Sequence, residues 1–292
     1  MKKFLYWFLA LAITLAAAYY QRTTGPTYPK KTRITLNRKD YDLRLVRSIE
    51  IGDRSEVRLN VNDTTIKASI FYRRFPTNDN YVSAQFRYKT YPIKSWTMNK
   101  VFNIYEESGF YAEVPQQQAA GKIQYYIEVT DSKGSTEIFK NDPVIIRFKG
   151  AVPTYILAPH ILLMFIAMLF STLAGLMCFG KNLPYRKYSI WTLALFITGG
   201  IILGPVVQEY AFGELWTGVP FGWDLTDNKT LIALIFWIIA VVMNWNKERR
   251  WYIAIAAFVL LLVYSIPHSM FGSELNYTTG TVNQGIILNL FI

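Results

Sequence analysis

The sequence holds two histidines, and both fall where an apolar run meets polar residues. His160 lies in YILAPHILLMF, one helical turn inside an uncharged run, and His268 lies in YSIPHSMFGSEL, just after the last such run. Imidazole binds metals and exchanges protons near neutral pH. An ionisable side chain within an apolar layer is costly, so these positions favour a binding function. A histidine that only bonds a backbone carbonyl is the alternative.

Carboxylates and tryptophans gather in the segment between the two histidines. The stretch VVQEYAFGELWTGVPFGWDLTDNKT starts at Val206 and contains several turn residues before an apolar run. Its candidate site residues are Glu209, Glu214, Trp216, Trp223, Asp224 and Asp227. If the apolar runs cross a membrane, this segment and both histidines lie on the same side, where their side chains can form one site.

This order of histidine, tryptophan-and-aspartate loop and histidine resembles the heme-handling membrane proteins of cytochrome c assembly. In that family a tryptophan-rich loop ending in Trp-Asp is the platform for heme, and a histidine on each side supplies an axial ligand. The resemblance implies that heme is the cofactor, that Trp216, Trp223 and Asp224 form the platform, and that His160 and His268 are the ligands. Flat indoles stack on a porphyrin, and two imidazoles complete the coordination of its iron.

Carboxylates and imidazoles together also suit a divalent metal ion such as zinc, manganese or iron. Glu209, Glu214 and Asp227 are the carboxylates that would join the histidines in such a site. No HExxH pattern is present, so the spacing matches no known metal motif. The middles of the apolar runs hold no acid or base, which argues against a transmembrane proton relay.

A structural role explains the same loop without any cofactor. Its glycines and Pro220 are typical turn residues. Asp227 is expected to cap the helix that follows, because a carboxylate accepts hydrogen bonds from the free N–H groups of a helix start. Lys229 would then pair with Asp224 or Glu214, and the tryptophans would be interfacial anchors.

These residues must be positioned by a predicted transmembrane bundle over residues 152–270. The apolar runs cover about 155–179, 189–207, 230–245 and 251–266. Two connecting loops are basic, and they contain Lys181, Arg186, Lys187, Lys247, Arg249 and Arg250. The positive-inside rule makes these loops cytoplasmic, so segment 208–229 and the tail 271–292 face outward.

The first 20 residues, MKKFLYWFLALAITLAAAYY, have the pattern of a signal peptide or signal anchor. The chain that follows is therefore expected to be exported. Together with the charge of the loops, this predicts a bacterial-type inner membrane protein with the polar segment on the extracytoplasmic side.

Residues 28–150 read as an all-β domain. Period-2 runs rich in Val, Ile, Tyr and Phe are separated by Asp, Asn, Gly and Pro. They are EVRLNV, TIKASIFYRRF, YVSAQFRYKTY, GFYAEVP, KIQYYIEVTD and PVIIRFK. Strands of this number and length suit a two-sheet sandwich, and GFYAEVPQQQAAGKIQYYIEVTDSKG resembles the late strands of fibronectin type III or bacterial immunoglobulin-like domains. The fold class is thus an immunoglobulin-like sandwich followed by a four-helix transmembrane bundle.

Charge and composition narrow the function. Residues 22–150 contain 22 basic and 14 acidic residues, which favours anionic lipid, an acidic glycan or an acidic protein as partner. Nucleic acid is not expected, because no nucleic-acid module is present. The lone Cys178 excludes an intrachain disulfide and is expected to be buried filler.

No signature of a soluble enzyme appears in the sequence. The sequence therefore predicts an integral membrane protein that handles heme or serves electron transfer as an accessory protein. A non-catalytic scaffold or complex subunit, whose sandwich binds a protein or glycan, is the first alternative. A protein that binds a divalent metal is the second.

Overall fold

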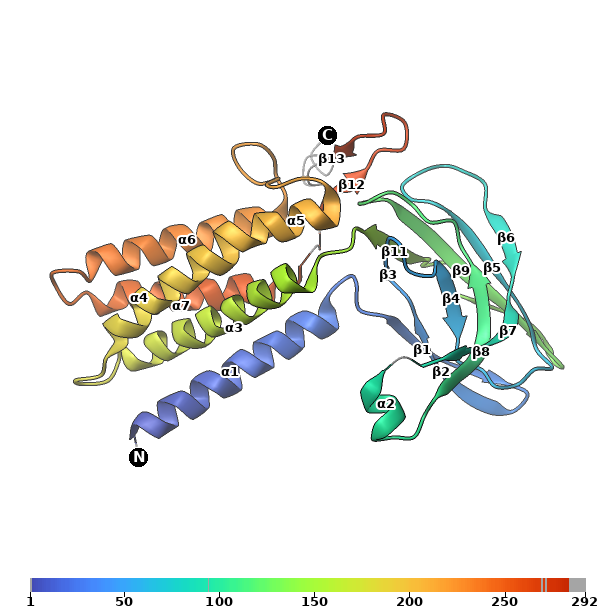
Figure 1. The fold of residues 1–292 in the computed structure, drawn as a ribbon, viewed down its shortest axis with the longest axis horizontal. Helices are drawn as coiled ribbons and strands as arrows, with labels where there is room; N and C mark the ends of the chain where they lie inside the picture. Colours follow the sequence, from blue (N-terminus) through green and yellow to red (C-terminus); the bar gives the residue numbers. More distant parts are fainter. Residues whose placement is uncertain (1, 94, 269, 271, 284–292) are drawn as a thin grey trace. The chain divides into compact units, whose positions relative to one another are not determined.

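A computed structural model describes residues 2–93, 95–268, 270 and 272–283. The chain divides into two compact units (Figure 1). The helical unit contains Met1–Pro26, Gly150–Glu274 and the chain from Thr281. The β unit contains Thr27–Lys149 and Leu275–Gly280. The prediction of a β domain followed by apolar helices is confirmed at this level.

The β unit is built from three sheets. Its strands are β1 (Lys30–Leu36), β2 (Lys39–Leu45), β3 (Ser48–Glu50), β4 (Glu56–Leu59), β5 (Lys67–Arg74), β6 (Val82–Gln85), β7 (Arg87–Pro92), β8 (Glu106–Glu113), β9 (Lys122–Asp131), β10 (Gly134–Ile138) and β11 (Val144–Lys149). The largest sheet has the order β3-β11-β9-β5-β6, with β10 also paired to β9. A second sheet has the order β4-β8-β7, and β1 pairs with β2. A short helix, α2 (Trp96–Lys100), separates β7 from β8.

One predicted run becomes two strands in two sheets. The run YVSAQFRYKTY forms β6, which pairs with β5, and β7, which pairs with β8. Between them the side chain of Phe86 is buried, and its backbone N–H bonds the carbonyl of Ala68. The chain therefore crosses from one sheet to the other around a core residue, and this crossing joins the two layers.

The sheets of the β unit share one hydrophobic core. Alternate residues of β5 and β9 supply much of it, because successive side chains of a strand point to opposite faces. The hydroxyl of Tyr125 lies within this core and donates to the carbonyl of Val46. The unit also includes residues that follow the bundle in sequence. The hydroxyl of Tyr277 bonds both the N–H and the carbonyl of Lys122 at the start of β9.

The helical unit contains α1 (Lys2–Thr24), α3 (Thr154–Met177), α4 (Tyr185–Phe196), a π-helical segment η1 (Ile197–Leu203), α5 (Gly204–Phe212), α6 (Leu225–Met243) and α7 (Arg250–Ser265). Short strands β12 (Glu274–Leu275) and β13 (Val282–Asn283) follow. By length and composition, four helices can cross a membrane: α1, α3, the continuous run from α4 to α5, and α6. Helix α7 is apolar but shorter.

The first segment packs with the bundle. In α1 the side chains of Ala10 and Thr14 are buried, and the ring of Trp7 makes edge contacts with Phe170 and Tyr188. Figure 1 shows α1 running beside α3. The helical unit thus has a fifth member besides the four predicted spans. Whether the segment is cleaved as a signal peptide stays a prediction.

The two ends of the bundle differ in composition. We call the end with residues 213–224 and the end of α7 the loop end, because Lys229 near the start of α6 reaches Ile266 there. The opposite end, with the α3–α4 and α6–α7 connections, is the basic end, where Arg250 bonds the carbonyl of Gly180. Of the predicted tail, residues 284–292 lie outside the described residues.

Candidate functional site

The loop that contains the predicted site is folded onto the start of α6. Helix α5 ends at Phe212 and is capped by Gly213, whose φ of 80° is left-handed and suits glycine. The indole N–H of Trp216 donates to the carbonyl of Val219. At Gly218 a Cβ atom would lie 2.7 Å from the Cβ of Asp227, so the loop can approach α6 this closely only with glycine.

The cap of α6 is Asp224, and the prediction that Asp227 caps this helix is wrong. The carboxylate of Asp224 accepts from the N–H of Thr226 at 2.7 Å. Asp227 lies within the first turn, and its carboxylate accepts from the N–H and the hydroxyl of Thr217 at 2.6 and 3.0 Å. The helix starts one turn earlier than expected, so the two carboxylates exchange roles. Both are buried.

Three elements meet in one polar network at this end. Gln208 of α5 donates its amide to the hydroxyl of Thr217 at 2.6 Å, and that hydroxyl donates to Asp227. Asn228 accepts from the N–H of Val219 at 2.7 Å. Helix α5, the loop and α6 are therefore joined by hydrogen bonds between side chains and backbone, which fix the loop in one conformation.

Lys229 is buried, and its partners are not the predicted carboxylates. Its ammonium donates to the carbonyl of Ile266 at 2.6 Å, and the carbonyl of Pro267 lies 3.5 Å away. These carbonyls follow the last turn of α7, where free carbonyls carry partial negative charge. Lys229 thus caps α7 from the neighbouring helix, and Asp224 contributes attraction at longer range.

His160 is half-buried on α3 and faces the π-helical segment. Its Nδ1 lies 2.8 Å from the carbonyl oxygen of Gly199. Because a carbonyl only accepts, Nδ1 carries the proton and Nε2 keeps a lone pair. Ligating histidines are typically oriented in this way, through the nitrogen that does not bind the metal. Single π-helical turns are also frequent at functional sites.

His268 is brought near His160, although 108 positions separate them in the sequence. Its side chain is exposed, but the protein around it reduces hydration and so lowers the pKa of His268. The positive charges of Lys229 and His160 lower that pKa further, which places these groups within electrostatic reach. The structure therefore brings both histidines to the loop end.

The aromatic residues of the loop divide into two kinds. Trp216 is half-buried, and its indole N–H makes a hydrogen bond within the loop. Trp223 and Phe221 are exposed, at 51% and 75%. Of the two predicted platform tryptophans, Trp223 is the one that offers an accessible ring.

The predicted metal ligands do not form a cluster in the described residues. Glu209 is exposed on α5, Glu214 is half-buried in the loop, and Asp227 is occupied by Thr217. Over the described part of the chain, no group of three or more His, Cys, Asp and Glu side chains is arranged to hold a metal ion. The divalent-metal prediction gains no support from this arrangement.

Sequence reasoning missed the parts of the site that come from the backbone and from amides. Gln208, the carbonyl of Gly199 and the buried position of Lys229 were not predicted. The isolated lysine at the start of an apolar run was the available signal for Lys229. A hydrogen bond from a histidine to a distant carbonyl leaves no signal in the sequence.

Comparisons with protein-family models, curated proteins and solved structures found no match to this chain. The fold defines a class of chain with a β unit and a helical unit, in which four helices are long and apolar enough to cross a bilayer.

Proposed function

We propose that this chain is an integral membrane protein that binds heme at the loop end, where His160 and His268 would hold its iron. The observation that carries the proposal is the hydrogen bond from His160 Nδ1 to the carbonyl of Gly199, which leaves Nε2 free to ligate. His268 lies within electrostatic reach of the same ring. Extracytoplasmic placement and a role as an accessory protein of electron transfer or cytochrome assembly belong to the same proposal.

The residues present fit a group that needs two imidazoles better than a bare metal ion. A hexacoordinate heme iron takes two protein ligands, because the porphyrin supplies the other four. Two histidines match that requirement, and among the described residues no group of three or more His, Cys, Asp and Glu side chains is arranged to hold a bare metal ion. The exposed ring of Trp223 is available for contact with an aromatic macrocycle.

Bound heme would supply one-electron chemistry, and the chain would set its ligands and surroundings. The carbonyl of Gly199 holds the ring of His160 in one orientation and fixes its tautomer. Lys229 places a positive charge near His268, which helps to keep that imidazole neutral and able to ligate. The hydrogen-bonded loop is a rigid support for Trp223.

The test uses full-length protein purified through a tag that contains no histidine, because His160 and His268 are the two histidines of the sequence. Heme is added to the protein in detergent, and the absorption spectrum is recorded. We expect a low-spin spectrum with one heme per chain. His160→Ala and His268→Ala should each abolish the low-spin spectrum, whereas Tyr252→Ala at the basic end should not.

Failure of the unaltered protein to take up heme would contradict the proposal. The same holds for a low-spin spectrum that survives in either histidine variant. Gln208→Ala is a useful further control, because it perturbs the loop network without removing a proposed ligand.

A second candidate function, a membrane-anchored scaffold, is favoured by one feature of the β unit. The connection between β7 and β8, which includes α2, exposes a cluster of large apolar side chains: Trp96, Met98, Val101, Phe102, Ile104 and Tyr105. Beside it lies a cavity of about 680 Å³, lined in part by Met98, Ile104 and the ion pair of Arg58 with Glu107. Exposed apolar patches next to polar groups often bind other proteins.

The scaffold candidate predicts that Trp96→Ser with Phe102→Ser weakens recovery of a bound protein or glycan by the full-length chain. Tyr19→Ser with Tyr20→Ser, which changes exposed aromatic residues of α1, is the matched control. Equal recovery with both pairs of changes would remove this candidate. Neither result depends on heme.

A further inference from the structure

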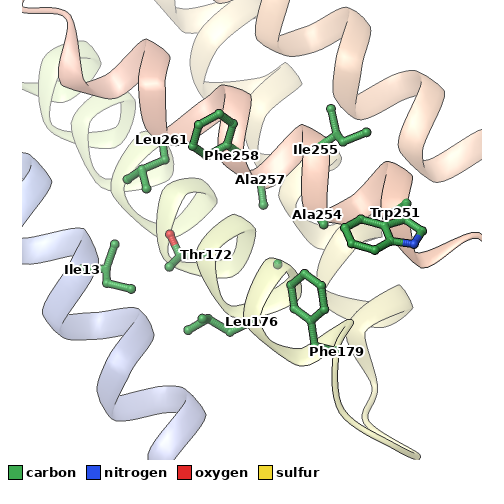
Figure 2. A pocket seen from close by; sticks show the side chains of 11 residues that line it. Ile13, Thr172, Leu176, Phe179, Trp251, Ala254, Ile255, Ala257, Phe258 and Leu261 are labelled. Atoms are coloured by element: carbon green, nitrogen blue, oxygen red, sulfur yellow. The ribbon is translucent and has the colours of Figure 1, made fainter.

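The helical unit has an apolar groove that the heme proposal does not use. It has a volume of about 410 Å³ and is lined by Ile13, Thr172, Gly175, Leu176, Phe179, Trp251, Ala254, Ile255, Ala257, Phe258 and Leu261. Figure 2 shows these side chains around the space between α1, α3 and α7. Apart from the Thr172 hydroxyl, the lining side chains offer carbon and one indole nitrogen. The groove therefore suits an alkyl chain.

Small residues make the floor of this groove and large ones make its rim. A Cβ atom at Gly175 would lie 2.6 Å from the Cβ of Ala257, so α3 and α7 are in close contact along the floor. Phe179, Trp251 and Phe258 are exposed at 67%, 72% and 60%. In a bilayer such exposed rings of a transmembrane bundle face lipid, so the groove is open to an acyl chain from the side.

One end of the groove lies at the basic end of the bundle. The rings of Phe179 and Trp251 meet edge to face there, with centroids 5.9 Å apart (Figure 2). Lys181 follows Phe179 by two residues, and Arg249 precedes Trp251 by two. Both basic side chains are exposed. Two residues of chain span at most about 7 Å, so the backbone of both basic residues lies near the end of the groove.

Charge at this end favours an anionic head group. The connections at the basic end hold six basic residues, Lys181, Arg186, Lys187, Lys247, Arg249 and Arg250, and one acidic residue, Glu248. Glu248 is paired with Arg250 at 2.9 Å, and Arg250 also binds Gly180. The guanidinium of Arg249 makes only a long contact of 3.9 Å with the sulfur of Met243, so it and Lys181 can bind an external anion. Basic residues beside transmembrane helices typically attract anionic lipids.

We propose that the groove binds one anionic phospholipid, with an acyl chain between α1, α3 and α7 and its phosphate group beside Lys181 and Arg249. The apolar space, the exposed aromatic rim and the two cations select such a lipid over a zwitterionic one. The site is independent of the histidines, which lie at the other end of the bundle.

The test is native mass spectrometry of the full-length protein in detergent, titrated with phosphatidylglycerol or phosphatidylcholine that carry the same acyl chains. We expect one phosphatidylglycerol to remain bound per chain, and phosphatidylcholine to bind more weakly. Replacing both cations, Lys181→Gln with Arg249→Gln, should remove the preference for phosphatidylglycerol, a loss of about 30-fold at about fivefold per charge. Lys187→Gln is the control for loss of charge at the same end.

Filling the groove tests the acyl chain separately. Ala254→Phe should abolish retention of both lipids, whereas Ile239→Phe on the exposed face of α6 should not. If Ala254→Phe fails to fold, Trp251→Ala removes an exposed side chain of the rim and should weaken retention of both lipids. Equal binding of the two lipids to the unaltered protein would overturn the proposal. The proposal would also be overturned if Ala254→Phe left the retention of lipid unchanged, or if a second copy of the chain filled the groove.

Discussion

The two ends of the bundle use the same device in different surroundings. At the loop end, Lys229 near the start of α6 donates to the carbonyls of Ile266 and Pro267 after α7. At the basic end, Arg250 at the start of α7 donates to the carbonyl of Gly180 after α3. In both cases a cation at the beginning of one helix satisfies the free carbonyls at the end of its neighbour.

The difference lies in burial and in what accompanies the cation. Lys229 is buried, and its surroundings include the buried carboxylates Asp224 and Asp227. Arg250 is half-exposed, and its ion-pair partner Glu248 is also accessible to solvent. A buried polar group that loses its partner is strongly destabilising, whereas an exposed ion pair contributes little. The loop end should therefore respond far more to mutation than the basic end.

The largest effect is expected from Asp227→Ala. The change removes the acceptor for the N–H and the hydroxyl of Thr217, which is fully buried. The N–H then has no partner and the hydroxyl keeps only the amide of Gln208, which should lower the free energy of unfolding by about 3 kcal/mol. This change in the free energy of unfolding is measured by unfolding the protein in mixed detergent micelles. Glu214→Ala, in the same loop, is the control and should stay within about 0.5 kcal/mol of the unaltered protein.

Lys229→Met should have the next largest effect. The carbonyl of Ile266 loses its donor, but a buried charge also disappears, which offsets part of the loss. The expected net decrease in the free energy of unfolding is about 2 kcal/mol. The same micelle assay applies, with Lys187→Met as an exposed control. A stability equal to that of the control would show that the buried cap contributes nothing.

Arg250→Met tests the same comparison at the basic end of the bundle. Its hydrogen bond to Gly180 and its ion pair with Glu248 are both accessible to water, so the decrease should be about 1 kcal/mol or less. The decrease should shrink further at high salt, because salt screens exposed charges. A loss as large as that of Lys229→Met would refute the proposed difference between the two ends.

The smallest effect concerns pH. The pKa of His268 is lowered in the folded protein, first by reduced hydration and then by the charges of Lys229 and His160. Below about pH 6.5 the unfolded chain binds more protons at this position, so stability falls as the pH falls. Because the side chain is exposed, the change between pH 7 and pH 5 should be below about 1 kcal/mol. The melting temperature of His268→Asn should depend less steeply on pH over this range than that of the unaltered protein. An unchanged dependence on pH would contradict this prediction.

Much of the β unit could be predicted, because its core strands alternate cleanly. The period-2 runs from Glu56 to Lys149 correspond to β4–β9 and β11. Strands β1 and β2 were missed, since KKTRITL and KDYDLRL are mostly charged on the face that is not buried and carry few apolar residues. A strand with so many charged residues cannot be told from a loop in a single sequence.

The sequence predicted which residues form the site but not their hydrogen bonds. That the histidines and the loop share one ligand site stays a prediction, although the chain places them at the loop end of the bundle. They could not decide between Asp224 and Asp227 as the cap, because that depends on a shift of one turn in where α6 begins. The partner of Lys229 lies 37 positions away and is a backbone carbonyl, which cannot be recognised from the type of any residue.

The hydroxyl of Tyr277 closes the start of β9 by bonding both backbone groups of Lys122. Tyr277 follows α1 to α7 in the sequence, so translation must pass through all of these helices before the two hydrogen bonds can form. The last contact of β9 therefore depends on a segment made after the helices, and the β unit cannot be completed by its own contiguous stretch of chain.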